Sequence, residues 1–462
     1  MSSNPTEKRF SFFHRTIRPE RIMVLGFLVV IIIGTILLTL PIASRSGESV
    51  GAHSALFTAT SAVCVTGLIV VDTADTYTFF GQVVVLLLIQ IGGLGFMIVA
   101  TLLMVALGRR ISLRNRVLIR ESMNASSLSG MVRLTKSFSM LAVMIEMLGA
   151  LVLSMRFVPL LGIRKGIWYS IFHAVSAFCN AGFDLFGGFR SLDRFQHDPL
   201  VLLTIAGLII LGGLGFSVIS ELLVNRFHFK RLTLHTKMVV TITSLLLVFG
   251  TLTILALEWG NPLTMGAPEL NVGERLVNSF FQSTTLRTAG YASFDQANLT
   301  DSSKLIGVIL MFIGASPAST GGGVKTTTFG VMLLLVLSVV RGRETVGLFG
   351  KQLAVSIVRR ALTIVIISIG IVLACTMALS ISEHGNGRSM LDLLYEAVSA
   401  FATVGLTSVG TASLNPVSQG LLVPIMFFGR VGPLTLALAL ASKLENNPRN
   451  RMHYPEEKIM IG

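Results

Sequence analysis

Long apolar segments recur along the whole chain, separated by shorter apolar segments and polar loops. A helix needs about 20 largely apolar residues to cross a bilayer. Segments of that length fall into four pairs. The first members are about 22–43, 137–158, 238–258 and 361–381, and the second members are about 79–107, 200–224, 304–340 and 420–442. The pattern therefore predicts eight membrane-spanning helices.

A shorter apolar segment lies between the members of each pair, at 52–63, 167–178, 275–285 and 390–401. These segments are too short to cross, so we expect half-helices that enter the membrane and turn back. Backbone that leaves the helical conformation at that depth must face a water-filled cavity or packed protein, because lipid cannot satisfy its polar groups.

Each short segment carries one repeated pattern: an aromatic residue, then small and hydroxyl residues, then a glycine and one apolar residue. The copies read FTATSAVCVTGL (57–68), FHAVSAFCNAGF (172–183), FFQSTTLRTAGY (280–291) and YEAVSAFATVGL (395–406). Four copies in phase predict four loops around one axis. The fold expected is an all-α membrane protein with eight transmembrane helices in four helix–pore loop–helix repeats around one pore.

The spans set the boundaries of these repeats, which we place at 22–107, 131–224, 238–340 and 361–442. A segment at 1–21 precedes the first repeat, and a tail at 443–462 follows the last. We expect both to lie on the cytoplasmic side.

Charge placement supports this topology. The chain is 52% hydrophobic and 13% charged, with a mean hydropathy of +0.77, whereas a soluble domain carries about 25% charged residues. The net charge of +14 comes from clusters before the first span, on every second loop and in the tail. The clusters are Arg9, Arg15, Arg18 and Arg21; Arg109, Arg110, Arg114, Arg116 and Arg120; Arg226, Lys230, Arg231 and Lys237; Arg341, Arg343, Lys351, Arg359 and Arg360; and Arg449, Arg451 and Lys458. This positive-inside bias predicts cytoplasmic termini, glycine loops facing outside, and no nucleic-acid partner.

The glycine loops are the candidate cation site. The C-terminal end of each short helix would point at the centre with roughly half a negative charge, and carbonyl oxygens beside each glycine can replace the water shell of a cation. No carboxylate lies in these loops, which favours a large monovalent cation over a divalent one. The candidate selectivity-filter residues are Val65, Thr66, Gly67, Asn180, Ala181, Gly182, Thr288, Ala289, Gly290, Thr403, Val404 and Gly405.

Arg287 breaks the symmetry of these loops, since the other copies have Cys64, Cys179 and Ala402 at its position. Two interpretations are open. The guanidinium is either buried behind the loop, where it braces the backbone, or it is a solvated charge at the pore mouth.

The second member of the third pair should be broken in mid-membrane, because it contains a proline and three consecutive glycines, all of which weaken a helix. A phosphate-binding loop is disfavoured, since Val324 separates the glycines from Lys325 and no strand precedes them. We predict a gate below the filter, with Lys325 either part of the barrier or emerging at the cytoplasmic side. The candidate gate residues are Gly314, Ala315, Ser316, Pro317, Ala318, Ser319, Thr320, Gly321, Gly322, Gly323, Val324, Lys325 and Arg430.

Ionisable residues within spans usually face a cavity or a partner. Arg430, in the last span, is therefore expected to form the barrier to cation flow together with 314–324. Glu146 is expected to pair with a neighbouring helix.

Glycines recur in the second members of the pairs. Gly92 and Gly212, in the IGGLGF and LGGLGF stretches, are interpreted as sites of close helix packing.

An enzyme that uses Lys325 or His173 is a weaker hypothesis, since no acid, base or metal constellation accompanies either residue, and the three cysteines have no metal-binding spacing. We predict no catalytic residue and no covalently bound cofactor.

The motifs TSAVCVTGL, NAGF, RTAGY, IGGLGF, STGGGVK and FGRVGPLT resemble the Trk/Ktr/HKT superfamily, over 18–462, and are most similar to the membrane subunits of bacterial Ktr potassium uptake systems. The resemblance implies uptake of K+ as substrate, with Na+ as a possible activator. It also implies a homodimer with one pore per protomer, in the bilayer of the cell membrane. A cytoplasmic ring of KtrA-like nucleotide-binding regulatory subunits would open a gate formed by the broken third helix and Arg430.

Four features of the sequence bear on the ion selectivity, gating and dimerisation that this resemblance implies. Tyr291 stands where many relatives have Phe, and Pro317 lies within the gating segment. Relatives with Ser at the first filter position tend toward sodium, so Gly67 favours potassium over the alternative, a sodium-preferring transporter on the same scaffold. The tail HYPEEKIMIG resembles a terminal segment that packs at the dimer interface.

Overall fold

The computed structural model describes residues 19–95, 98, 131–226, 228–343, 345–433 and 435, with the side chains of 19, 20 and 131–134 excepted. The expectations for the segment before residue 19, the basic cluster at 109–120 and the tail at 443–462 therefore lie outside the described residues.

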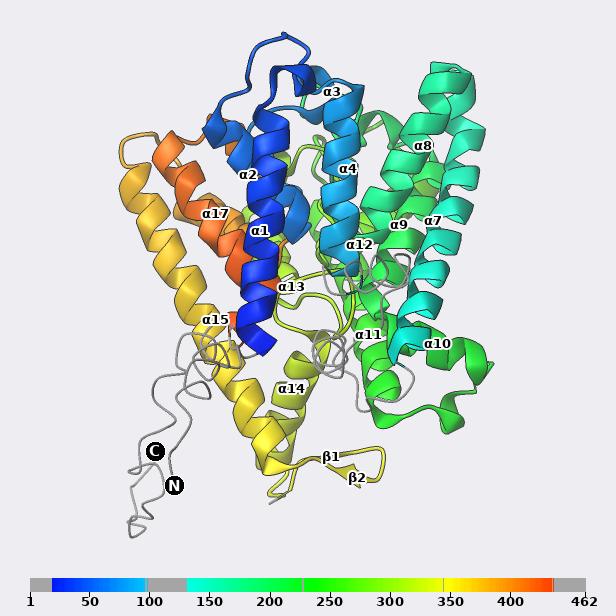
Figure 1. Cartoon of the computed structure of the whole chain (residues 1–462). Coiled ribbons are helices and arrows are strands. Elements are labelled where there is room, and N and C mark those ends of the chain that lie inside the picture. The colour runs from blue at the N-terminus through cyan, green and yellow to red at the C-terminus, as the bar shows by residue number, and fades with distance from the viewer. Residues whose placement is uncertain are drawn as a thin grey trace, which may run out of the picture.

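The first member of each pair forms a long helix. These helices are α1 (Pro19–Thr39), α7 (Met131–Leu161), α11 (Leu234–Glu258) and α15 (Val355–Ser382). Each contains a stretch long and apolar enough to cross a membrane, and they are the only single helices among the described residues that do. Large apolar side chains face outward on them, such as Ile36 (60% exposed) and Leu148 (63% exposed). This part of the prediction is confirmed (Figure 1).

The short apolar segments form helices close to the predicted bounds. They are α2 (Ala52–Cys64), α8 (Ile163–Phe178), α12 (Val272–Thr285) and α16 (Met390–Ala402). Side-chain caps start two of them. Asn271 and Glu274 form a reciprocal capping box on α12, and the Ser389 hydroxyl accepts the amide of Leu391 at the start of α16. The last turn of each short helix is buried.

In each repeat the helix of the second member ends inside the predicted span; the break in the third was predicted, and the helix ends at Leu94, Leu214 and Val431 were not. They consist of α4 (Phe79–Leu94), α9 (Pro199–Leu214) with α10 (Phe216–Val224), α13 (Asp301–Phe312) with α14 (Thr326–Val340), and α17 (Pro416–Val431). Gly95, Gly215 and Gly432 end three of these helices at φ of 86°, 91° and 92°. A glycine adopts such values without steric cost, so the chain turns there. The axes of α9 and α10 differ by 97°, and together they are a candidate fifth span.

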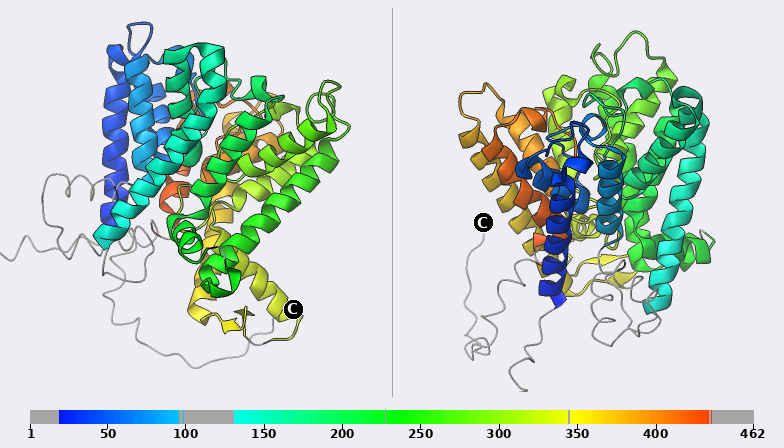
Figure 2. Two further views of the ribbon diagram at one scale, coloured as in Figure 1. Left: turned by 90° about the vertical axis from the view of Figure 1, so that its right-hand side faces the viewer. Right: turned by 45° about the horizontal axis from the view of Figure 1, so that its top comes forward.

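Short elements join these helices. They are α3 (Thr73–Thr76), the 3₁₀ turns Pro41–Ala43, Asp193–Phe195, Phe229–Arg231, Gln296–Asn298 and Thr411–Ser413, and a hairpin of β1 (Gly347–Leu348) and β2 (Lys351–Gln352). The hairpin is antiparallel, with Gly347 opposite Gln352. It lies at the same end of the molecule as the connection from α10 to α11, and α3 lies at the other end (Figures 1 and 2).

Polar pairs hold neighbouring repeats together inside this bundle. The Gln90 amide on α4 donates to the Glu146 carboxylate on α7 at 3.0 Å, which confirms the expected pairing of Glu146 with a neighbouring helix. Lys304 on α13 lies 2.8 Å from Asp392 on α16, and Asp392 also accepts from Ser408 at 2.9 Å. The second of these pairs anchors the segment that follows the fourth glycine loop.

Candidate functional site

The four glycine loops share one backbone conformation. Two residues before each glycine, a non-glycine residue adopts a left-handed conformation: Val65, Asn180, Thr288 and Thr403 have φ of 51°, 58°, 67° and 52°. The glycines themselves, Gly67, Gly182, Gly290 and Gly405, have φ of 88°, 68°, 81° and 96°. The left-handed conformation costs an ordinary residue about 1–2 kcal/mol. Such strain persists where the surrounding structure imposes it, and it concentrates at functional sites.

These glycines form a closed ring. Each glycine is packed against the next loop of the ring. The atom that it meets there is the carbonyl oxygen of the residue just before that loop's own glycine. The contacts are Gly67 with Ala181, Gly182 with Ala289, Gly290 with Val404, and Gly405 with Thr66. A Cβ added to Gly67 or Gly182 would lie 2.5 Å from that oxygen, and one added to the other two glycines would lie closer. The structure thus brings the predicted loops together in chain order, with no room for a side chain at any of the glycine positions.

Hydroxyl groups from the short helices brace the ring, and the sequence interpretation had assigned them no role. The amides of Gly67 and Gly405 each donate to a serine hydroxyl, Ser61 and Ser399, at 3.1 Å. In the other two loops the hydroxyl donates instead: Ser176 to the Phe183 carbonyl at 2.9 Å, and Thr285 to the Tyr291 carbonyl at 2.6 Å. The signal was present in three copies, in which a serine lies six residues before the glycine; in the third copy the bracing Thr285 lies five residues before Gly290.

The predicted break in the third repeat is confirmed. Helix α13 ends at Phe312 and α14 begins at Thr326. The segment between them, 313–325, contains the residues predicted to form a gate and is called the gating loop below after that prediction. Its two ends run parallel as a bridge between Ile313 and Val324, and the Gly314 amide donates to the Val324 carbonyl at 2.8 Å. The two ends of the loop are therefore held together by backbone contacts, and the loop leaves and rejoins the helix at nearly the same place.

The gating loop lies directly against the glycine ring. The Gly322 amide donates to the Thr403 hydroxyl at 3.1 Å, and the Cα of Gly321 lies beside the Thr288 hydroxyl. On another side, the Thr320 amide donates to the Gly212 carbonyl at 3.2 Å. The loop thus contacts the second, third and fourth repeats immediately next to the left-handed residues of the ring.

Arg430 joins the gating loop to the first repeat. Its guanidinium donates to the carbonyls of Thr320 and Gly92, and to the Gly93 carbonyl at 3.2 Å. Lys325 folds back onto the loop, where its ammonium donates to the Gly321 carbonyl at 2.7 Å. Sequence reasoning placed Arg430 at the level of the broken helix, and the structure brings the two together. Among the described residues, neither cation has a carboxylate partner.

Arg287 is buried, with 8% of its surface exposed, so the structure agrees with the first of its two interpretations. Its guanidinium reaches the Gly314 carbonyl at 3.4 Å. The brace that we expected on its own loop is therefore directed at the gating loop instead.

The glycines of the second members pack against the ends of the short helices. The Cα of Gly92 lies against the Val63 carbonyl, and that of Gly212 lies against the Phe178 carbonyl. Gly429 has the same relation to Phe401, whereas Gly314 faces Gly322 within the gating loop. This agrees with the interpretation of Gly92 and Gly212 as sites of close helix packing.

A substitution pair on α9 tests this packing. Gly212→Ala is expected to lower the melting temperature, because its methyl group would overlap the Phe178 carbonyl and force a backbone shift that costs roughly 1–3 kcal/mol. Gly207→Ala is the control, since nothing lies within 4 Å of a Cβ there. Thermal unfolding of both purified variants is the measurement, and equal melting temperatures would contradict the packing assigned to Gly212.

His173, the other candidate in the enzyme hypothesis, is engaged in the structure. Its Nδ1 lies 2.7 Å from the Tyr169 carbonyl, and the Leu185 amide donates to its Nε2 at 3.4 Å. Both ring nitrogens therefore contact backbone on either side of the second loop, at Tyr169 and Leu185.

Comparison with known proteins shows that this is a membrane cation transport protein. The chain belongs to the TrkH family of cation transport proteins, whose family model matches residues 8–451. It is therefore a transporter and not an enzyme.

Relatives of nearly the same length support this membership. The chain is 40% identical to the potassium/sodium uptake protein NtpJ of Enterococcus hirae, with 97% of this chain and 98% of that protein covered. It is also 40% identical to the Ktr system potassium uptake protein B of Bacillus subtilis, with 96% and 97% covered. The crystal structure of the potassium transporter TrkH from Vibrio parahaemolyticus has the same fold, at a TM-score of 0.70 and 16% identity over 95% of this chain and 87% of that one.

Proposed function

We propose that this protein takes up potassium across the cell membrane, with the glycine ring as its selectivity filter. The observation that carries the proposal is the closed ring in which the carbonyls of Thr66, Ala181, Ala289 and Val404 lie between consecutive loops. Carbonyl oxygens without carboxylates suit a large, weakly hydrated monovalent cation. The names of the relatives, which are potassium or potassium/sodium uptake proteins, support the same substrate.

Complementation of a cell that lacks potassium uptake tests this function. The wild-type chain should restore growth at low potassium and take up rubidium. Gly67→Ser should reduce rubidium uptake relative to sodium uptake, because the added side chain would meet the Ala181 carbonyl at a position with φ of 88°. Failure of the wild type to rescue growth, or equal uptake ratios in the two proteins, would contradict the proposal.

The second candidate function is a sodium-preferring transporter on the same scaffold. The Enterococcus relative supports it, because that protein is named as a potassium/sodium uptake protein. Competition separates the two. Excess sodium should leave rubidium uptake by the wild type largely intact if the ring selects potassium, and should abolish it if sodium is the preferred ion.

The gating loop and Arg430 are proposed as the gate. We also propose that the chain crosses the membrane eight times, with both termini cytoplasmic. The loop is next to the ring, and two cations line it. Positive charge beside a cation path raises the barrier to passage. Opening would then require Arg430 to release the carbonyls of Thr320 and Gly92.

A cytoplasmic nucleotide-binding subunit is the proposed regulator of this gate, acting on a homodimer of the chain. The support is the Ktr system named for the relatives and an exposed basic surface at the hairpin end. There, Phe229 and Phe349 contact each other with ring centroids 5.8 Å apart, and Lys237 lies over both rings. The basic residues of this surface are Arg226, Lys230, Arg231, Arg341, Arg343, Lys351, Arg359 and Arg360.

Co-purification tests this partner. A nucleotide-binding cytoplasmic protein should be retained by the wild type and lost when Arg341 and Arg343 are changed to Glu. Anionic lipid is the other candidate for this surface. The proposal would be contradicted if the protein bound anionic vesicles but retained no protein partner. It would also be contradicted if a dimer isolated alone were fully regulated.

Tyr291 provides a further test of the filter. Its hydroxyl donates to the Phe183 carbonyl at 2.9 Å and so ties the third loop to the second. Tyr291→Phe should lower the potassium-to-sodium selectivity ratio several-fold with little change in protein yield, because a loosened ring discriminates ion size less well. Tyr395→Phe is the matched control, since its hydroxyl bonds the Gln296 side chain away from the ring. Equal selectivity in Tyr291→Phe and the wild type would argue against this role.

A further inference from the structure

The left-handed residues of the ring use their side chains to hold the gating loop. The Thr403 hydroxyl accepts the Gly322 amide at 3.1 Å, and the Thr288 hydroxyl lies beside the Cα of Gly321. A Cβ added to either glycine would overlap the hydroxyl that it faces. Both hydroxyls are buried, so the third and fourth loops of the ring are in direct contact with the gating loop.

The second loop makes the same kind of contact, whereas the first loop does not. The carboxamide of Asn180 lies 3.1 Å from the Thr320 hydroxyl and 3.2 Å from the Thr288 hydroxyl. Val65, at the corresponding position of the first loop, has an entirely apolar side chain. The first repeat is instead joined to the gating loop by Arg430, which bonds the Thr320 carbonyl. Three of the four left-handed residues therefore hold the gating loop through polar side chains.

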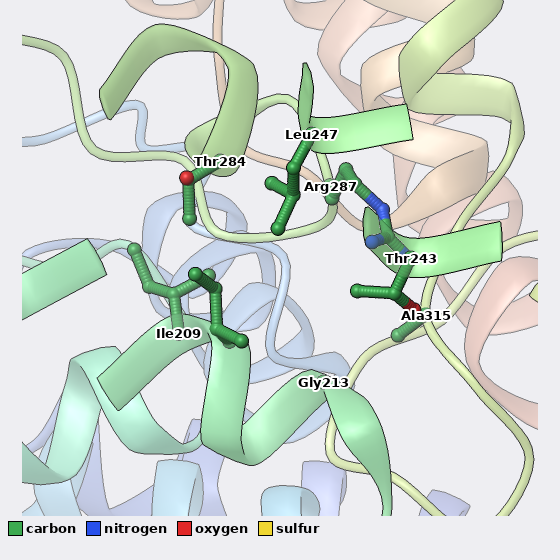
Figure 3. Close-up of a pocket in the computed structure, with 8 residues that line it drawn as sticks. Ile209, Gly213, Thr243, Leu247, Thr284, Arg287 and Ala315 are labelled. Atoms are coloured by element: carbon green, nitrogen blue, oxygen red, sulfur yellow. The ribbon is translucent and has the colours of Figure 1, made fainter. Parts of the chain in front are cut away.

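Arg287, which precedes Thr288 in the chain, adds a contact from the third loop. Its guanidinium donates to the Gly314 carbonyl at 3.4 Å. In Figure 3 this side chain is directed toward Ala315 of the gating loop. The third loop thus contacts the gating loop near its start, through Arg287, and near its end, through Thr288.

These residues also set the course of the ring. Thr288 and Thr403 are β-branched, and a positive φ is rare in such residues and costs about 1–2 kcal/mol. Each immediately precedes a residue whose carbonyl faces a neighbouring loop, namely Ala289 and Val404. Strained conformations persist only where surrounding contacts impose them. Release of the gating loop would remove such contacts, and it would deprive the buried Thr403 hydroxyl of its donor. The ring carbonyls would then shift.

We propose that Asn180, Thr288 and Thr403 couple the ring to the gating loop, so that a cation bound in the ring and a closed gating loop stabilise each other. The three are positioning residues, because they act through the ring carbonyls and the loop backbone. Coupling between two sites is reciprocal. An occupied ring therefore delays release of the loop, and a released loop weakens cation binding. This inference rests on the proposed function, in which the ring binds potassium and the loop is the gate.

Hydrogen exchange of the full chain in detergent, followed by mass spectrometry, tests this coupling. The amides of Gly314 and Thr320 report on the loop, because their acceptors are the carbonyls of Val324 and Gly212, outside the ring. Exchange there requires local opening. Replacing N-methylglucamine chloride by potassium chloride at constant ionic strength should slow it at least about fivefold in the wild type.

Substitutions at Thr403 separate coupling from simple support of the loop. Thr403→Val keeps the β-branched shape but removes the acceptor of the Gly322 amide, and should reduce the potassium effect to less than about twofold. Thr403→Ser keeps the hydroxyl and should restore most of the effect. Thr288→Val is a second test with the same expectation as Thr403→Val. Thr60→Val is the matched control, since that buried hydroxyl on α2 has no hydrogen-bond partner among the described residues.

The outcomes distinguish this coupling from the proposed function. A wild type that takes up rubidium but shows no potassium effect on exchange would overturn the coupling and leave the proposed function standing. Absence of both would contradict both. Faster exchange of Thr403→Val in the two salts, with the wild-type ratio between them, would show that Thr403 only supports the loop and would also overturn the coupling.

Discussion

Arg430→Gln is expected to raise the cation leak through the protein at least roughly tenfold in the absence of any regulatory partner. The guanidinium bonds the carbonyls of Thr320 and Gly92 at once, and so joins the gating loop to the first repeat. Hydrogen bonds from a charged group contribute about 1.5–3 kcal/mol each. Glutamine is shorter and uncharged, so it loses most of both bonds, and each 1.4 kcal/mol lost shifts the closed-to-open equilibrium about tenfold. Rubidium efflux from proteoliposomes measures the leak.

Two further variants sharpen this experiment. Arg430→Lys keeps the charge but cannot bridge both carbonyls, so an intermediate leak would separate the bridge from the electrostatic barrier. Arg275→Gln removes a guanidinium that also donates to backbone carbonyls, but in the first turn of α12, and should leave the leak unchanged. A leak in Arg430→Gln equal to that of the wild type would contradict the gate.

Gly405→Ala is expected to abolish rubidium uptake, with a loss on the order of 100-fold or more. The glycine has φ of 96°, and its Cα lies against the Thr66 carbonyl, so a methyl group there would push apart the first and fourth loops. The strain of the left-handed conformation alone costs about 1–2 kcal/mol. If the ring is the filter proposed above, displacement of its Thr66 carbonyl would add to this cost and remove a ligand from the ion. Uptake per correctly inserted protein is the quantity to measure.

Gly410→Ala is a matched control for this prediction. Gly410 also has a positive φ of 71°, but the nearest atom to its added Cβ would be the Ser413 hydroxyl at 3.7 Å. It therefore carries the conformational strain without the crowding of the ring. Similar loss of uptake in both variants would indicate strain in the fourth repeat rather than damage to the filter.

The architecture near the ring could be predicted because the repeated motif encodes it locally. Each short helix ends where its apolar segment ends, and each loop needs a glycine because another backbone approaches it. Four copies in one chain left few arrangements other than a ring. The break before Thr326 was also readable, since proline and consecutive glycines oppose a helix wherever they occur.

Other features could not be predicted, because tertiary packing decides them. The turns at Gly95, Gly215 and Gly432 were missed for another reason: paired glycines precede the first two and Pro433 follows the third, but the glycines of these stretches were interpreted as sites of close helix packing. A cation within a span needs a partner, but the sequence does not indicate that Arg430 finds carbonyls of the first repeat. The direction of Arg287 toward Gly314 likewise depends on contacts between repeats.

The ring of carbonyls is the feature on which the proposed function rests, and anomalous diffraction from crystals grown in rubidium tests it most directly. A rubidium peak is predicted on the axis enclosed by the carbonyl oxygens of Thr66, Ala181, Ala289 and Val404. No peak at that position, in a preparation that transports rubidium, would contradict the account.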